Sequence, residues 1–98
     1  MKKSRYSIQA TTRFQREFKR VVKRDRGLEE KFLTVIEKLS LDPFARQLQT
    51  HVVNVHGFGK VYSSRITGDI RIIWDFKDDT IILLFRIGGH SGGLNVYK

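Results

Sequence analysis

The sequence predicts an α+β domain in which an N-terminal strand and an antiparallel helix pair precede an antiparallel β-meander. Two amphipathic helical stripes within residues 12–41 and three alternating strands within residues 61–87 are the observations behind this prediction. The helical stripes need an apolar cover, and one face of the meander supplies it, so we expect both helices to pack on that face of the sheet. The chain has 98 residues, which predicts a single domain over residues 1–98.

The N-terminal part begins with a short strand expected at residues 6–9, where Tyr6 and Ile8 alternate with polar residues. The first helix follows at once, because Thr12 and Gln15 have the spacing of a capping box. The apolar stripe of this helix consists of Phe14, Phe18, Val21 and Val22. This spacing predicts a helix with one face toward the core.

Gly27 is expected to end the first helix, and Asp42 with Pro43 to stop the second. The second apolar stripe consists of Leu28, Phe32, Val35, Ile36 and Leu39. So short a connection predicts an antiparallel pair. The remaining surface of the first helix carries the cations Arg13, Arg16, Lys19, Arg20, Lys23 and Arg24. Both a solvated face and a phosphate-contact face are consistent with these cations.

The C-terminal half of the chain predicts the meander. Residues 43–60 are the least regular part, with a short strand expected around residues 52–55 and a glycine-containing loop after it. Longer strands are expected at about residues 61–67, 70–76 and 80–87. The connections between them are short, which predicts antiparallel pairing.

Arginines stand in this meander where a sheet is usually apolar. A turn at residues 67–69 places Arg65 opposite Arg71, and a turn at residues 78–79 places Arg71 opposite Arg86. Like charges directly opposite each other destabilise a sheet, so a row of arginines indicates that an anion lies there. The same register lines up, on the other face, Ile66, Ile70 and Ile87; Ile72 and Phe85; and Tyr62, Trp74 and Leu83. A slip of one residue would mix the two faces.

The composition narrows the class of binding partner. Nineteen Lys and Arg against ten Asp and Glu give a net charge of +9, which favours RNA, DNA, an anionic membrane or an acidic protein, unless the basic surface is simply solvated. The sequence has no cysteine, which excludes disulfides, thiolate metal sites and thiol catalysis. No apolar run reaches the roughly 18 residues of a membrane span. We therefore expect a cytoplasmic protein that acts on nucleic acid rather than in a membrane.

Strand parity places several polar side chains on one face at one end of the sheet: Arg65, Asp69, Arg71, Arg86 and His90. An acid, a base and several cations suit cleavage of an RNA phosphodiester, in which the 2′-hydroxyl is the nucleophile. Histidine transfers protons near neutral pH, and arginine holds phosphate in a bidentate fork. The alternative is structural: Asp69 follows a glycine as a turn residue does, and His90 follows two glycines as a loop residue does.

Metal and cofactor chemistry have little support in the sequence. His51, His56 and His90 are the only histidines, and they lack the spacing of a metal site. Phosphate-loop and nucleophile-elbow motifs are absent. We therefore expect neither a metal nor a small-molecule cofactor.

Five short motifs, in order and spacing, resemble the RelE/ParE toxin superfamily, in particular its RelE and YafQ mRNA-interferase branch. They are residues 12–18 (TRFQREF), 48–51 (LQTH), 65–74 (RITGDIRIIW), 87–91 (IGGHS) and 96–97 (VY). The resemblance spans nearly the whole chain. It implies a type II toxin: a small, metal-independent endoribonuclease that cuts mRNA on the ribosome and is held inactive by a cognate antitoxin.

The resemblance also implies the site. By motif match, site roles pass to His51, Asp69, Arg71, His90 and Tyr97. Arg71, helped by Arg65, would stabilise the phosphate, and Arg86 completes the arginine row that binds the substrate. Proton transfer would fall to His90 and to either Asp69 or His51. Tyr97 would orient the substrate or stack on it.

Two departures from the family pattern keep other functions open. Val52 and Val53 stand where relatives carry Lys-Leu, so a cation is missing, and residues 91–95 lengthen the path from His90 to Tyr97. The superfamily also includes gyrase poisons, and a shared fold does not settle the target. The alternatives are a DNA gyrase inhibitor and a weak or inactive relative that only binds antitoxin or nucleic acid.

Overall fold

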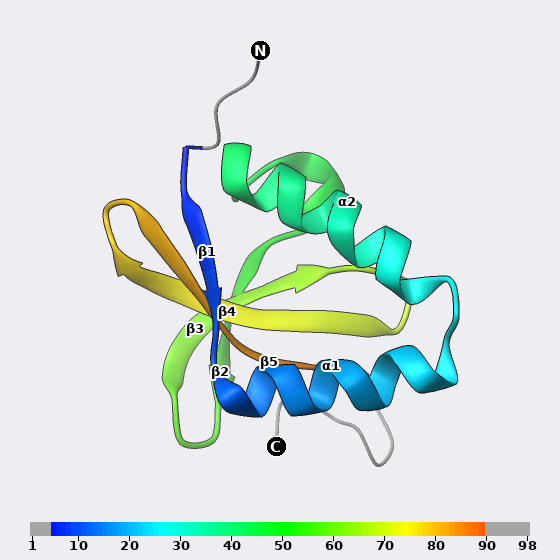
Figure 1. Ribbon diagram of the computed structural model, residues 1–98. Helices are drawn as coiled ribbons and strands as arrows, with labels where there is room; N and C mark the ends of the chain where they lie inside the picture. The colour runs from blue at the N-terminus through cyan, green and yellow to red at the C-terminus, as the bar shows by residue number, and fades with distance from the viewer. Residues whose placement is uncertain (1–4, 90–98) are drawn as a thin grey trace.

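The computed structural model describes residues 5–89, and both helices of this part pack on one face of a mixed sheet (Figure 1). In chain order the elements are β1 Ser7–Ala10, α1 Thr12–Arg24, α2 Leu28–Leu41, a 3-10 turn at Arg46–Leu48, β2 His51–Val55, β3 Gly59–Arg65, β4 Ile70–Asp78 and β5 Ile81–Gly89. The strand order is β1-β5-β4-β3-β2, with β1 parallel to β5 and the other neighbours antiparallel. The predicted α+β class and order of elements are confirmed.

Both ends of the first helix differ from the prediction, whereas the second helix ends at Leu41, directly before Asp42, as predicted. Thr11, rather than Thr12, caps α1: its hydroxyl accepts a hydrogen bond from the Phe14 amide at 3.0 Å. The Thr11 hydroxyl also donates to the carbonyl of Phe85 at 3.2 Å, which ties the start of α1 to β5. Gly27 does not end α1, since that helix ends at Arg24 and Gly27 precedes α2 with an ordinary φ of −82°.

Replacement of Thr11 by alanine tests this capping assignment. We expect Thr11→Ala to lower the free energy of unfolding by about 0.5–2 kcal/mol, because an amide of the first turn loses its acceptor. The neighbouring Thr12→Ala serves as the matched control, since Thr12 is exposed and does not cap the helix. Urea unfolding of both variants measures the difference. Equal losses in the two variants would contradict the assignment.

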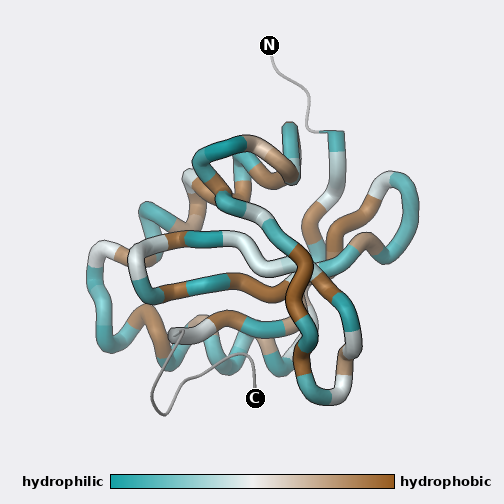
Figure 2. Tube along the Cα trace, turned by 180° about the vertical axis from the view of Figure 1, so that it is seen from behind, coloured by the Kyte–Doolittle hydropathy of each residue, from teal (hydrophilic) through white to brown (hydrophobic). Residues whose placement is uncertain are grey.

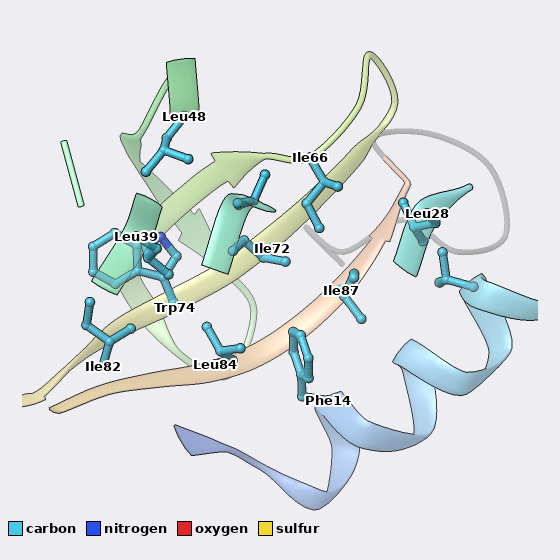
Figure 3. Packing of buried hydrophobic residues seen from close by; sticks show 12 residues of the cluster. Phe14, Leu28, Leu39, Leu48, Ile66, Ile72, Trp74, Ile82, Leu84 and Ile87 are labelled. Atoms are coloured by element: carbon cyan, nitrogen blue, oxygen red, sulfur yellow. The ribbon is translucent and has the colours of Figure 1, made fainter. Parts of the chain in front are cut away.

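The main core lies between the helices and the sheet (Figure 3). Its fully covered side chains include Leu28, Leu39, Leu48, Ile72, Trp74, Ile82, Leu84 and Ile87. The indole of Trp74 donates to the Ser64 hydroxyl at 2.7 Å, and Ser64 lies 2.7 Å from the hydroxyl of Thr50. Thr50 in turn donates to the carbonyl of Pro43 at 2.7 Å. This chain of hydrogen bonds gives the buried polar groups of the core their partners.

The opposite face of the sheet is not uniformly open. A second apolar cluster forms there from Val55, Val61 and Ile73, with Val53, Phe58 and Phe85 packed against it. Figure 2 views this side and shows hydrophilic and hydrophobic residues alternating along the strands. Apolar side chains therefore cover part of this face.

The strand register is as predicted between β3 and β4 but not between β4 and β5. Arg65 pairs with Arg71, and Tyr62 pairs with Trp74, as expected. The pairs between β4 and β5 differ from the predicted ones. They are Ile70 with Gly89, Arg71 with Gly88, Ile72 with Ile87, Ile73 with Arg86, and Trp74 with Leu84. Arg86 is thus not opposite Arg71, and the predicted row of three arginines is wrong at its third member.

Turn position and a bulge explain this difference. Asp78 pairs with Ile81, so the turn lies at residues 79–80 rather than 78–79. The Asp78 carboxylate closes it by accepting from the Thr80 amide at 2.7 Å and the Thr80 hydroxyl at 3.0 Å. The same two hydrogen bonds hold the pKa of Asp78 below its usual value. Register shifts at Ile73/Trp74 and at Phe76/Asp78 then displace the remaining pairs.

Candidate functional site

Two arginine side chains converge at the end of the β3–β4 hairpin. Arg65 and Arg71 are directly opposite each other across the two strands. Nε of Arg65 donates to the carbonyl oxygen of Thr67 at 3.1 Å, and Nη1 of Arg71 donates to the same oxygen at 2.7 Å. Both side chains are partly buried. One electronegative atom therefore holds two cations side by side, which is the arrangement expected around a phosphate.

The turn between β3 and β4 fixes this arrangement. The Thr67 hydroxyl accepts from the amides of Asp69 at 3.2 Å and Ile70 at 2.9 Å. The amides of Ile66 and Thr67 both donate to the carbonyl of Ile70, at 2.9 Å and 3.3 Å. Because the backbone of the turn is held by these bonds, the Thr67 carbonyl has a set direction and orients both guanidinium groups.

His51 reaches the same face of the sheet from β2. It pairs with Ser63, which is two residues before Arg65 on β3. Residues two apart on a strand share a face, so His51 lies on the face of the arginine pair, one row away. Its Nδ1 is 3.0 Å from the carbonyl oxygen of Gln49. A bond to a carbonyl requires the proton on Nδ1, which leaves Nε2 of the neutral ring as a proton acceptor.

Asp69 lies in the turn itself and is exposed. Its amide donates to the Thr67 hydroxyl, so Asp69 takes the position of a turn residue, between Arg65 and Arg71 along the chain. The other predicted site residues, His90 and Tyr97, lie outside the described residues. Within residues 5–89, no three His, Asp or Glu side chains are grouped in a way that would hold a metal ion. None of the helices in that range is long and apolar enough to cross a membrane.

Arg86 has a different surrounding from that predicted. Its side chain is 9% exposed, and its Nη2 lies 2.8 Å from Oε2 of Glu17 on α1. The other carboxylate oxygen of Glu17 accepts from the Ile87 amide at 3.3 Å. Glu17 also lies 3.9 Å from the more exposed Arg13. The structure thus joins Arg86 to α1 through a nearly buried ion pair.

Comparison with known proteins places this geometry on a known fold. No protein-family model and no curated protein sequence match the chain. YafQ in the DinJ–YafQ complex of Escherichia coli superposes with a TM-score of 0.68 at 14% identity, over 88% of this chain and 93% of YafQ. The protein HP0894 of Helicobacter pylori gives 0.63 at 29% identity, over 87% and 94%. The chain has the RelE/YafQ-like toxin fold. RelE in the RelE–RelB complex of Pyrococcus horikoshii agrees, with a TM-score of 0.67 at 18% identity, over 89% and 97%.

Within this RelE/YafQ-like fold, the structure brings Arg65, Arg71 and His51 to one face. Arg86 is one row from the arginine pair, in the row of His51, and its side chain is bound to Glu17. Glu17 is the residue of interest that sequence reasoning missed. Its partner Arg86 lies 69 residues away along the chain, so no local pattern connects the two residues. The available signal was an acidic residue in a helix otherwise rich in cations.

Proposed function

We propose that this chain is the toxin of a type II toxin–antitoxin system and acts as a metal-independent endoribonuclease on mRNA at the ribosome. The observation that carries the proposal is the Arg65–Arg71 pair, which converges on one oxygen atom with His51 on the same face. The RelE/YafQ-like toxin fold and the net charge of +9 support it.

The proposed reaction is an internal transfer at phosphorus. The 2′-hydroxyl loses its proton to a general base and attacks the adjacent phosphorus, and the bond to the 5′-oxygen of the next nucleotide breaks. We assign the role of base to Nε2 of His51, with Asp69 the other candidate. His90 is the proposed acid that protonates the leaving oxygen. The products are a 2′,3′-cyclic phosphate and a 5′-hydroxyl, and no bond to the protein forms.

The arginines would stabilise the charge that develops on the phosphate. Each guanidinium has five N–H donors, and the bond to Thr67 uses one from each arginine. Arg71 would take the principal role, with Arg65 assisting, since donors already in place need little reorganisation when the charge appears. Tyr97 is proposed to orient the substrate or stack on a base.

The proposed protein partner is an acidic antitoxin. YafQ and RelE of the similar structures are complexed with DinJ and RelB, respectively. A chain of +9 is suited to an acidic partner, and such a complex should weaken as salt rises. Toxin, antitoxin and mRNA would meet in the cytoplasm.

Mapping of mRNA ends after incubation with translating ribosomes tests the function. We expect new 5′-hydroxyl ends within the coding region and 2′,3′-cyclic phosphates on the upstream fragments. A supercoiling assay with purified DNA gyrase at the same protein concentration is the control for the alternative activity. Intact mRNA together with blocked supercoiling would assign the chain to the gyrase inhibitors, and inactivity in both assays would leave only binding.

A further inference from the structure

A cationic pocket adjoins the arginine pair on its other side. It lies between α2, the 3-10 turn at Arg46–Leu48 and the end of β3, and has a volume of about 320 Å³. Its polar lining comes from Lys31, Thr34, Lys38, Gln47 and Arg65, and the rest is apolar. No acidic side chain lines it. A concave site with several cations and no anion favours a negatively charged ligand.

The polar residues of α2 that line the pocket lie on one face of the helix. Lys31, Thr34 and Lys38 are three, four and seven residues apart on α2, so they share one face of that helix. Neither lysine ammonium is within ion-pair distance of a carboxylate in residues 5–89. Arg65 closes the pocket from the sheet. The mutual repulsion of three cations is a cost that a bound anion would offset.

Arg65 joins this pocket to the candidate site. Its Nε bonds to the Thr67 carbonyl, as Nη1 of Arg71 does, and the same residue lines the pocket. An anion in the pocket and a phosphate at Arg71 would therefore both lie next to Arg65. Successive phosphates of a single RNA strand provide two such anions on one ligand.

We propose that the pocket of Lys31, Lys38 and Arg65 is a second phosphate subsite, which holds a phosphate of the RNA strand next to the one at Arg71. The inference rests on the proposed function and extends the substrate-binding surface across the end of β3. The subsite sets affinity and position along the strand, because it does not touch the bond that breaks. Its loss should raise KM and leave kcat at saturation unchanged.

Salt dependence of RNA binding tests the subsite. The probe is a ten-nucleotide RNA with 2′-O-methyl groups, which binds but cannot be cleaved. We expect the Lys31→Gln/Lys38→Gln double variant to bind more weakly and to lower the slope of log K against log salt by about 0.7, the value for one phosphate contact of a single strand. The control is Lys60→Gln/Lys77→Gln, which removes the same charge from exposed positions outside the pocket lining.

Each result has a stated meaning. A smaller slope in the Lys31/Lys38 variant alone supports the subsite, even if the native chain cleaves no mRNA, since the probe measures binding only. Equal losses of RNA affinity in both double variants would overturn the subsite, because they would show that binding depends only on the overall positive charge of the protein. Unchanged RNA binding with weaker binding of an acidic antitoxin would make the pocket a protein contact instead. Circular dichroism confirms that α2 is intact in each variant.

Discussion

Arg71→Ala is expected to reduce the rate of RNA cleavage by about 10²–10³, the usual loss when one donor to a developing oxyanion is removed. Its stability should change little. Arg71 is opposite Arg65, so the substitution removes a repulsion between like charges. The Thr67 carbonyl keeps the bond from Arg65. Single-turnover rates with saturating mRNA and ribosomes, together with urea unfolding, measure the two effects separately.

Two further substitutions sharpen this expectation. Arg71→Lys keeps the charge but loses the planar fork, so its rate should stay well below that of the native chain. Arg26→Ala removes an exposed arginine from the connection between the helices and should leave the rate unchanged. A folded Arg71→Ala protein that cleaves at the native rate would exclude Arg71 from catalysis.

The sequence predicted the arginine pair because a short turn determines the register of its hairpin. Thr67, Gly68 and Asp69 leave few ways to connect β3 to β4, and the alternation of both strands agrees with only one of them. The fold class followed from the same kind of local pattern in the helices. His51 was expected from motif resemblance, and the register of β2 with β3 places it on the face of the pair.

Arg86 shows where such reasoning fails. A tight turn at residues 79–80 and a bulge between Ile73 and Trp74 are not marked in the sequence, and together they move β5 along β4. Simple alternation no longer applies beyond a bulge. The pocket lined by Lys31 and Lys38 was missed for a related reason: it depends on how α2 lies against the end of β3, which no local pattern determines.

The Glu17–Arg86 ion pair lies beyond the part of β5 that pairs with β1. That pairing runs from Ile81 to Leu84, and within residues 5–89 no other strand pairs with β5 on this edge. Instead, Thr11 and Glu17, at the start of α1 and within it, supply hydrogen-bond partners to β5. Thr11 donates to the carbonyls of Leu84 and Phe85, through its amide at 3.0 Å and its hydroxyl at 3.2 Å. Glu17 accepts from the Ile87 amide and from Arg86.

Glu17→Ala is therefore expected to destabilise the protein by about 3–5 kcal/mol, the usual cost of removing one partner from a buried ion pair. Arg86 would keep its charge with 9% of its side chain exposed, and the Ile87 amide would lose its acceptor. Arg13→Ala is the matched control on the same helix. Arg13 is 52% exposed and 3.9 Å from Glu17, so its loss should cost at most about 1 kcal/mol.

A double substitution separates the ion pair from general damage to the helix. Replacing both partners by apolar residues, as in Glu17→Leu with Arg86→Met, removes both charges together and should recover much of the stability that Glu17→Ala loses. Urea unfolding of the native chain, of Glu17→Leu, of Arg86→Met and of the double variant gives the coupling energy of the pair. If Glu17→Ala costs no more than Arg13→Ala, or if the two single losses simply add, the carboxylate is not what holds the end of β5 to α1.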